Sequence, residues 1–136
     1  MPNTEQALIH ADGGGVRGYS ELVILEQLML GIRQHQKLSS TPKPCEIFDM
    51  ICGTSTGGII ALMLGRLRMS IDDTRNVYSQ VSKDVFGKPK NRKSTEGRYS
   101  ATNLERILKA AIEKYGEAGP ELKLIPENDG ATECKM

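Results

Sequence analysis

Apolar residues recur along this chain with spacings that predict a strand and a helix before the turn at residues 53–57. A weak strand is predicted at residues 7–11, and a helix from Ser20, its expected N-cap, to about Gln36. The polar and proline-bearing stretch 39–44 is expected to end that helix. The apolar stripe of the helix consists of Leu22, Leu25, Leu28 or Met29, and Ile32.

A second strand and two helices are predicted in the middle of the chain. The apolar run 50–52 is β-compatible, and the apolar run from residue 59 is long enough for a buried helix that reaches about Arg66. Ser70 is the expected N-cap of the next helix, which stays apolar on one face to about Phe86. That face is formed by Val77, Val81 and Val85.

The last predicted helix is the most regularly amphipathic one, with Ser100 or Thr102 as its N-cap and Tyr115 near its end. Polar residues with glycine and proline indicate loops at 87–97 and 116–128. The first of these loops is basic and could touch lipid headgroups or phosphate, but a solvated loop is the expected reading.

Composition narrows the possible classes of protein. The chain has 136 residues, which predicts a single domain over residues 1–136 with a hydrophobic core. A net charge of +1 argues against nucleic acid as the main partner. No apolar run is long enough for a transmembrane segment, and residues 1–6 do not resemble a signal peptide. Three cysteines, without metal-ligand spacing, are expected to be reduced thiols, with Cys52 in the core, in a cytoplasmic protein.

The turn between the second strand and its helix carries the candidate nucleophile. Residues 53–57 read Gly-Thr-Ser-Thr-Gly, and a serine at a strand-to-helix turn of this kind is a nucleophile elbow. Gly53 and Gly57 are required because side chains there would collide with the reversing backbone. The helix that follows directs its positive N-terminal end at Ser55, which favours an anionic intermediate. The alternative is an ordinary turn of small residues.

A second glycine motif follows the first predicted strand, where residues 12–18 read Asp-Gly-Gly-Gly-Val-Arg-Gly. The spacing Gly13-x-Gly15-x-x-Gly18 matches a dinucleotide-binding fingerprint, which needs an acidic residue about 20 positions later. Residues 32–42 contain no acidic residue. A P-loop is excluded because no Gly-Lys-Ser/Thr follows.

Together with a serine elbow, this glycine loop is best interpreted as an oxyanion hole. The backbone amides of Gly14 and Gly15 would face the negative charge of a tetrahedral intermediate. A simple tight turn does not explain why Arg17 stands among the glycines. Arg17 either fixes the loop by hydrogen bonds to its carbonyls or meets a lipid phosphate.

The serine also needs a general base. Both histidines, His10 and His35, precede Ser55 in the chain, so no histidine follows the serine as one does in an α/β-hydrolase. His35 is expected at the surface, and His10 is expected to be structural rather than catalytic. A carboxylate that acts directly on the serine is the simplest remaining scheme.

The two glycine motifs together resemble the patatin-like phospholipase family, on residues 12–18 and 53–58. The flanking stretches 44–49 and 64–70 resemble its fungal members. The resemblance implies a three-layer α/β/α fold with a parallel-type sheet, a Ser-Asp dyad and hydrolysis of glycerolipid acyl esters. It implies Ser55 as nucleophile and Gly13–Gly15 as oxyanion hole.

The family's catalytic aspartate lies in an Asp-Gly-Gly or Asp-Gly-Ala motif after several more strands. Asp129 begins an Asp-Gly-Ala sequence but comes early, inside a polar loop. Residues 134–136 resemble the start of a strand that precedes the family's own motif. We therefore expect that this chain holds the N-terminal part of the fold and stops early, and Asp129 is a secondary candidate for the base.

Three hypotheses follow. The first is a serine lipid acyl hydrolase with a lipid substrate, peripheral membrane contact and no metal or organic cofactor. The second is a catalytically incomplete remnant that binds lipid or a partner protein. The third is nucleotide binding through the glycine loop, which the missing acidic residue and the serine elbow both disfavour.

Overall fold

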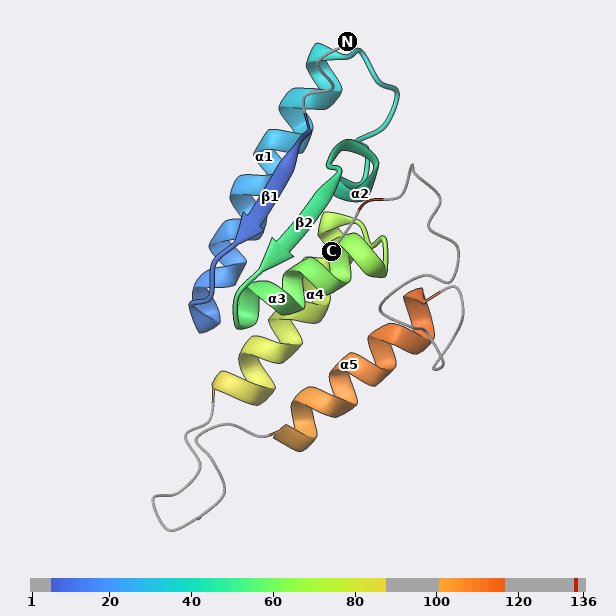
Figure 1. Cartoon of the computed structure of the whole chain (residues 1–136). Helices are drawn as coiled ribbons and strands as arrows, with labels where there is room; N and C mark the ends of the chain where they lie inside the picture. The colour runs from blue at the N-terminus through green and yellow to red at the C-terminus, as the bar shows by residue number, and fades with distance from the viewer. Residues whose placement is uncertain (1–5, 88–100, 117–133, 135–136) are drawn as a thin grey trace.

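The computed structural model describes residues 6–87, 101–116 and 134, and it contains two strands and a series of helices (Figure 1). The elements are β1 (Leu8–Ala11), the 3₁₀ turn η1 (Gly15–Arg17), α1 (Gly18–His35), α2 (Pro44–Ile47), β2 (Met50–Gly53), α3 (Thr56–Ala61), the π-helical turn η2 (Leu62–Arg66), α4 (Ile71–Val81), the π-helical turn η3 (Ser82–Phe86) and α5 (Ala101–Tyr115).

The two strands pair in parallel, with Leu8 opposite Met50 and Ala11 opposite Gly53. Parallel neighbours need a crossover connection, which α1 and α2 provide here. The carboxyl ends of both strands therefore lie at the same edge of the sheet, where β1 leads into the glycine loop and β2 into the serine turn (Figure 1). The prediction of an α/β fold with a parallel sheet is confirmed.

One face of the described sheet packs against helices. Ile9, Ala11 and Ile51 point to this face and belong to the hydrophobic core or pack against it. On the opposite face Leu8 is 59% exposed and Met50 is also exposed. Within the described ranges, the helices thus cover mainly one side of the strands.

Helix α1 buries one stripe of its surface against this core. Leu22 and Met29 are completely buried, whereas Leu28 remains 49% exposed. The third apolar position of the predicted stripe is therefore Met29. The helix begins at Gly18, directly after η1, so the prediction of Ser20 as its N-cap was wrong. The glycine loop closes into a helical turn on its own backbone hydrogen bonds and needs no side-chain cap.

The second half of the described chain follows its predicted pattern closely. Ser70 caps α4, because its hydroxyl accepts a hydrogen bond from the Asp73 amide at 3.1 Å. Val81 and Val85 are buried, and with Ile107 of α5 they form a smaller second cluster.

Two details of the prediction differ here. Thr102 lies inside α5 rather than at its N-cap, and Ser100 falls outside the described residues.

The described cysteines are free thiols, and their burial differs from the expectation. Cys52 points to the open face of the sheet and is only partly buried, whereas Cys45 in α2 is buried. Cys134, the only described residue of the strand predicted at 134–136, packs against the core and has no strand assignment.

None of the described helices is both long and apolar enough to cross a bilayer.

The packing of α1 predicts a large difference between two leucines six residues apart. Leu22→Ala should lower the free energy of unfolding by about 2–5 kcal/mol, because it removes buried methyl groups and leaves a cavity. Leu28→Ala, the same change at an exposed position, should have a small effect. Urea unfolding followed by circular dichroism measures both. Equal losses in the two variants would mean that α1 packs through a different face.

Candidate functional site

Ser55 occupies the sharp turn between β2 and α3, and its backbone is strained. Its φ of 57° and ψ of −121° lie in a region that residues with a side chain rarely adopt. The residue is exposed and stands at the N-cap of α3, whose first-turn amides have no partner within the helix. The strained strand-to-helix turn holds an exposed serine at the edge of the sheet, as the predicted nucleophile elbow would.

The two glycines that flank the serine lie in backbone contact with other parts of the turn. A Cβ atom at Gly53 would collide with the backbone of Gly57, and one at Gly57 would collide with the Ala11 carbonyl of β1. The Thr54 amide also donates to that carbonyl, at 3.0 Å. The elbow is therefore held directly against the end of β1, which is where the glycine loop begins.

The glycine loop packs beside the serine. A Cβ atom at Gly13 would lie 2.8 Å from the Ser55 Cβ and 3.5 Å from its Oγ, so only a glycine permits this approach. Farther along the loop, the Arg17 amide donates to the Gly14 carbonyl at 3.2 Å. The Arg17 side chain is exposed, and among the described residues its guanidinium makes no hydrogen bond to the loop carbonyls.

The amides of Gly14 and Gly15 converge on one oxygen atom. They donate to the Thr56 Oγ1 at 3.1 Å and 3.2 Å. Thr56 is the residue after Ser55 and is 7% exposed. Two neighbouring amides that donate to a single oxygen form the kind of donor pair that the predicted oxyanion hole would use. In the resting structure the acceptor is the threonine hydroxyl.

Tyr78 of α4 completes this part of the site and was not identified from the sequence. Its side chain is fully buried, and its hydroxyl donates a short hydrogen bond to the Gly15 carbonyl. Burial raises the pKa of Tyr78, an effect that a hydrogen bond from Thr56 partly offsets. One weak signal was present in the sequence, since Tyr78 is a polar aromatic residue within the buried stripe of an amphipathic helix.

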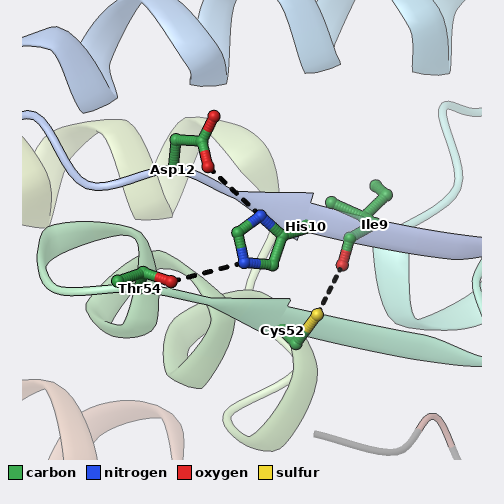
Figure 2. Close-up of polar contacts among 5 residues, drawn as sticks. All are labelled: Ile9, His10, Asp12, Cys52 and Thr54. Atoms are coloured by element: carbon green, nitrogen blue, oxygen red, sulfur yellow. Dashed lines mark hydrogen bonds and ion pairs between the residues drawn. The ribbon is translucent and has the colours of Figure 1, made fainter.

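His10 links the glycine loop to the elbow on the open face of the sheet (Figure 2). Its Nδ1 lies 3.3 Å from the Asp12 Oδ1, and its Nε2 lies 3.4 Å from the Thr54 Oγ1. Both distances are long, and the side chains of His10 and Asp12 are 53% and 84% exposed. His10 therefore contacts the residue before Ser55 and not the Ser55 hydroxyl, which agrees with a structural role.

An apolar cavity of about 360 Å³ opens beside the serine. Its walls come from the start of α3, from η3 and from the start of α5, so it lies between segments far apart in the sequence. The lining residues are Ser55, Thr56, Ile59, Val85, Phe86, Ala101 and Leu104. Ser55 and Thr56 provide the polar side chains of this lining.

No carboxylate or imidazole of residues 6–87, 101–116 and 134 hydrogen-bonds to the Ser55 hydroxyl. Asp129, the secondary candidate for the base, lies outside the described residues. Within the same ranges no cluster of histidine, cysteine or acidic side chains could hold a metal ion. His35 is exposed at the end of α1, as predicted.

Glu21 is an unpartnered carboxylate on α1 near the glycine loop. Its Oε2 is buried and has no hydrogen-bond partner in the described structure. Burial raises the pKa of Glu21, and the negative charge of Asp12 raises it further. With Asp12 and His10 it lines a second cavity of about 290 Å³ between β1 and α1, whose other walls are apolar.

Comparison with known proteins places this chain in a family. The family model described as patatin-like phospholipase matches residues 11–127. Phospholipase A I of Arabidopsis thaliana is 30% identical over 118 residues, which are 85% of this chain and 8% of that protein. Human calcium-independent phospholipase A2-gamma is 39% identical over 80 residues (58% of this chain, 9% of that protein). Patatin-like phospholipase 1 of Plasmodium falciparum is 36% identical over 80 residues (59% and 12%).

The chain therefore belongs to the patatin-like phospholipase family. The family match covers both glycine motifs and most of the described elements. The chain spans only about a tenth of the length of these curated relatives. No solved structure matches the chain.

The contact between Gly57 and β1 predicts a stability difference between adjacent glycines. Gly57→Ala should lower the free energy of unfolding by about 1–3 kcal/mol, because the new methyl group collides with the Ala11 carbonyl. Gly58→Ala should be neutral or slightly stabilising, since its Cβ would meet only ordinary contacts inside a helix. Thermal unfolding of both variants measures the difference, and a neutral Gly57→Ala would contradict the described packing.

The environment of Glu21 predicts a pH-dependent gain from its neutral analogue. A raised folded-state pKa means that ionised Glu21 destabilises the folded protein once the pH exceeds the unfolded value of about 4.3. Glu21→Gln should therefore raise Tm at pH 7, and the gain should shrink as the pH falls towards 4. Glu113→Gln, at an exposed position of α5, is the matched control. A gain that is independent of pH would refute this account.

Proposed function

We propose that this chain is a serine lipid acyl hydrolase of the phospholipase A type, which cleaves acyl esters of glycerolipids. The observation that carries the proposal is the combination at one point of a strained, exposed Ser55, two amides aimed at one oxygen and an apolar cavity. The family membership supports the same chemistry, since the relatives above carry phospholipase names.

In the proposed reaction Ser55 Oγ attacks the ester carbonyl carbon and transfers its proton to a carboxylate. The carbonyl oxygen becomes an oxyanion, takes the place of the Thr56 hydroxyl and accepts hydrogen bonds from Gly14 and Gly15. Collapse of the intermediate breaks the bond to the alkoxide, which takes the proton back from the carboxylic acid and leaves as the alcohol. The remaining acyl-serine is hydrolysed by water, which the regenerated carboxylate deprotonates. The family resemblance assigns the carboxylate to an aspartate, for which Asp129 is the candidate within this chain.

The substrate's acyl chain would enter the cavity beside Ser55. Its walls are almost entirely apolar, which suits a hydrocarbon chain and offers nothing to a charged group. Three exposed side chains next to the glycine loop suit a lipid surface. Val16 is 58% exposed and Tyr19 is 39% exposed, and Arg17 between them could meet a lipid phosphate. Peripheral contact with a membrane is part of the proposal.

The three-layer α/β/α arrangement of the fold is part of the same proposal. A three-layer α/β/α arrangement would place further helices on the sheet face that carries Leu8 and Met50, where both residues are exposed. This would also bring the general base to the serine from later in the fold.

The competing hypothesis is a remnant that keeps the oxyanion loop but lacks the base. Among the described residues the Ser55 hydroxyl has no basic hydrogen-bond partner, which is what this hypothesis expects.

Covalent labelling tests the nucleophile. A fluorophosphonate probe should add one adduct to the folded wild type by intact mass, and Ser55→Ala should abolish it. Ser20→Ala, at an exposed position in α1, should label like the wild type. If Asp129 is the base, Asp129→Asn should slow labelling by about 10²-fold or more. Unchanged labelling of Asp129→Asn would place the base at another residue.

Turnover tests the substrate class. The wild type should release fatty acid from mixed phosphatidylcholine and phosphatidylglycerol vesicles, and Ser55→Ala should not. A folded wild type that neither labels nor releases fatty acid would favour the remnant hypothesis. Labelling without fatty acid release would retain the nucleophile but argue against a glycerolipid substrate.

A further inference from the structure

Three hydrogen bonds tie the glycine loop to α3 and α4. The Gly14 and Gly15 amides donate to the Thr56 hydroxyl, and the Tyr78 hydroxyl donates to the carbonyl of the same Gly15. The Thr56 side chain also hydrogen-bonds to Tyr78. Residues from three separate elements therefore form one closed network, and both peptide groups next to the Gly15 Cα are fixed by it.

The two side chains that supply hydroxyl groups to this network are buried, whereas Gly14 is exposed and Gly15 is half-buried. Thr56 and Tyr78 are 7% and 0% exposed, so water does not compete for these hydroxyl groups. A hydrogen bond in such an environment is stronger than one at the surface, and an unpaired group there is costly. Loss of the Tyr78 hydroxyl would leave the Gly15 carbonyl without this partner.

The backbone makes room for the tyrosine at one position. A Cβ atom at Gly18 would overlap the Tyr78 hydroxyl and the adjacent ring carbon. Gly18 is the last glycine of the motif at residues 12–18 and the first residue of α1. Its φ of −56° is an ordinary helical value, so backbone conformation does not require glycine here. The space that Gly18 leaves is the space that Tyr78 fills.

We infer that Tyr78 is a positioning residue for the oxyanion hole, and that Gly18 is present to admit its hydroxyl to the Gly15 carbonyl. This inference rests on the proposed function, because it assigns Tyr78 a task in the stabilisation of the oxyanion. The hydroxyl fixes the rotation of the peptide group that follows Gly15. In the proposed reaction the oxyanion takes the place of the Thr56 hydroxyl on the two amides. The Tyr78 hydroxyl contacts the Gly15 carbonyl instead, so its hydrogen bond does not compete with the oxyanion.

The alternative is that Tyr78 only fills the core. Both roles require the aromatic ring, but only the positioning role requires the hydroxyl. The tyrosine ring packs in the main hydrophobic core between α1 and α4, where phenylalanine would fit equally well. Tyr78→Phe therefore separates the two roles, since it removes one oxygen atom and keeps the ring.

The first measurement is the saturating rate of fluorophosphonate labelling. Tyr78→Phe should lower this rate by roughly ten- to a hundredfold, less than the loss of an oxyanion donor itself, which costs about 10²–10³-fold. The probe concentration at half-saturation should change little. Tyr115→Phe is the matched control, because it removes a tyrosine hydroxyl that donates to Asp73 away from the loop. It should label at the wild-type rate.

A second pair of variants tests the contact between Gly18 and the Tyr78 hydroxyl by changing the glycine. Gly18→Ala should displace the Tyr78 hydroxyl and slow labelling to a similar extent. Gly31→Ala, in the same helix but with open space around its Cβ position, should have no effect on labelling. If Tyr78→Phe and Gly18→Ala act through the same contact, the variant that carries both changes should label only a little more slowly than Gly18→Ala alone.

Amide hydrogen exchange provides a readout that does not depend on catalysis. Tyr78→Phe should raise the exchange rates of the Gly14 and Gly15 amides at least fivefold, and Tyr115→Phe should leave them unchanged. A folded wild type that does not react with the probe would contradict the proposed function. The exchange rates of the Gly14 and Gly15 amides would still decide whether Tyr78 orders the loop. Unchanged labelling and exchange in folded Tyr78→Phe would overturn the inference and leave Tyr78 a core residue.

Discussion

The site depends on the contact between the serine turn and the end of β1. The backbone of Gly57 lies against the Ala11 carbonyl, which also accepts the Thr54 amide. This contact brings the residues that follow two parallel strands to one place, although they are more than forty positions apart in the sequence. The position of Gly13 beside Ser55 and the contact of the Gly14 and Gly15 amides with Thr56 follow from that approach.

Much of this arrangement could be predicted because it is encoded locally. Apolar spacing gave the two strands and the course of α1, α4 and α5, and the glycine patterns located both loops. Gly53 and Gly57 are recognisable because backbone contact excludes any larger residue. The start of α1 was misplaced at Ser20 because a capping side chain is a local signal, whereas the 3₁₀ turn that leads into α1 is not.

Other parts could not be read from the sequence, because they depend on which elements meet. Tyr78 lies about sixty residues after the loop that it contacts, and only the packing of α4 on α1 brings the two together. The same holds for the apolar cavity, whose walls include Val85 and Leu104. The partners of Thr56 were likewise unforeseen, since a threonine after the serine gives no sign of which amides it accepts.

The strained backbone of Ser55 has a consequence for how this chain can change over time. A residue with a φ of 57° and a ψ of −121° stores roughly 1–3 kcal/mol of conformational strain. Glycine would relieve that strain but would lack the hydroxyl. Glycine at position 55 would therefore be the more stable choice for the fold, at the cost of the hydroxyl. Folding stability alone does not favour a serine in this conformation.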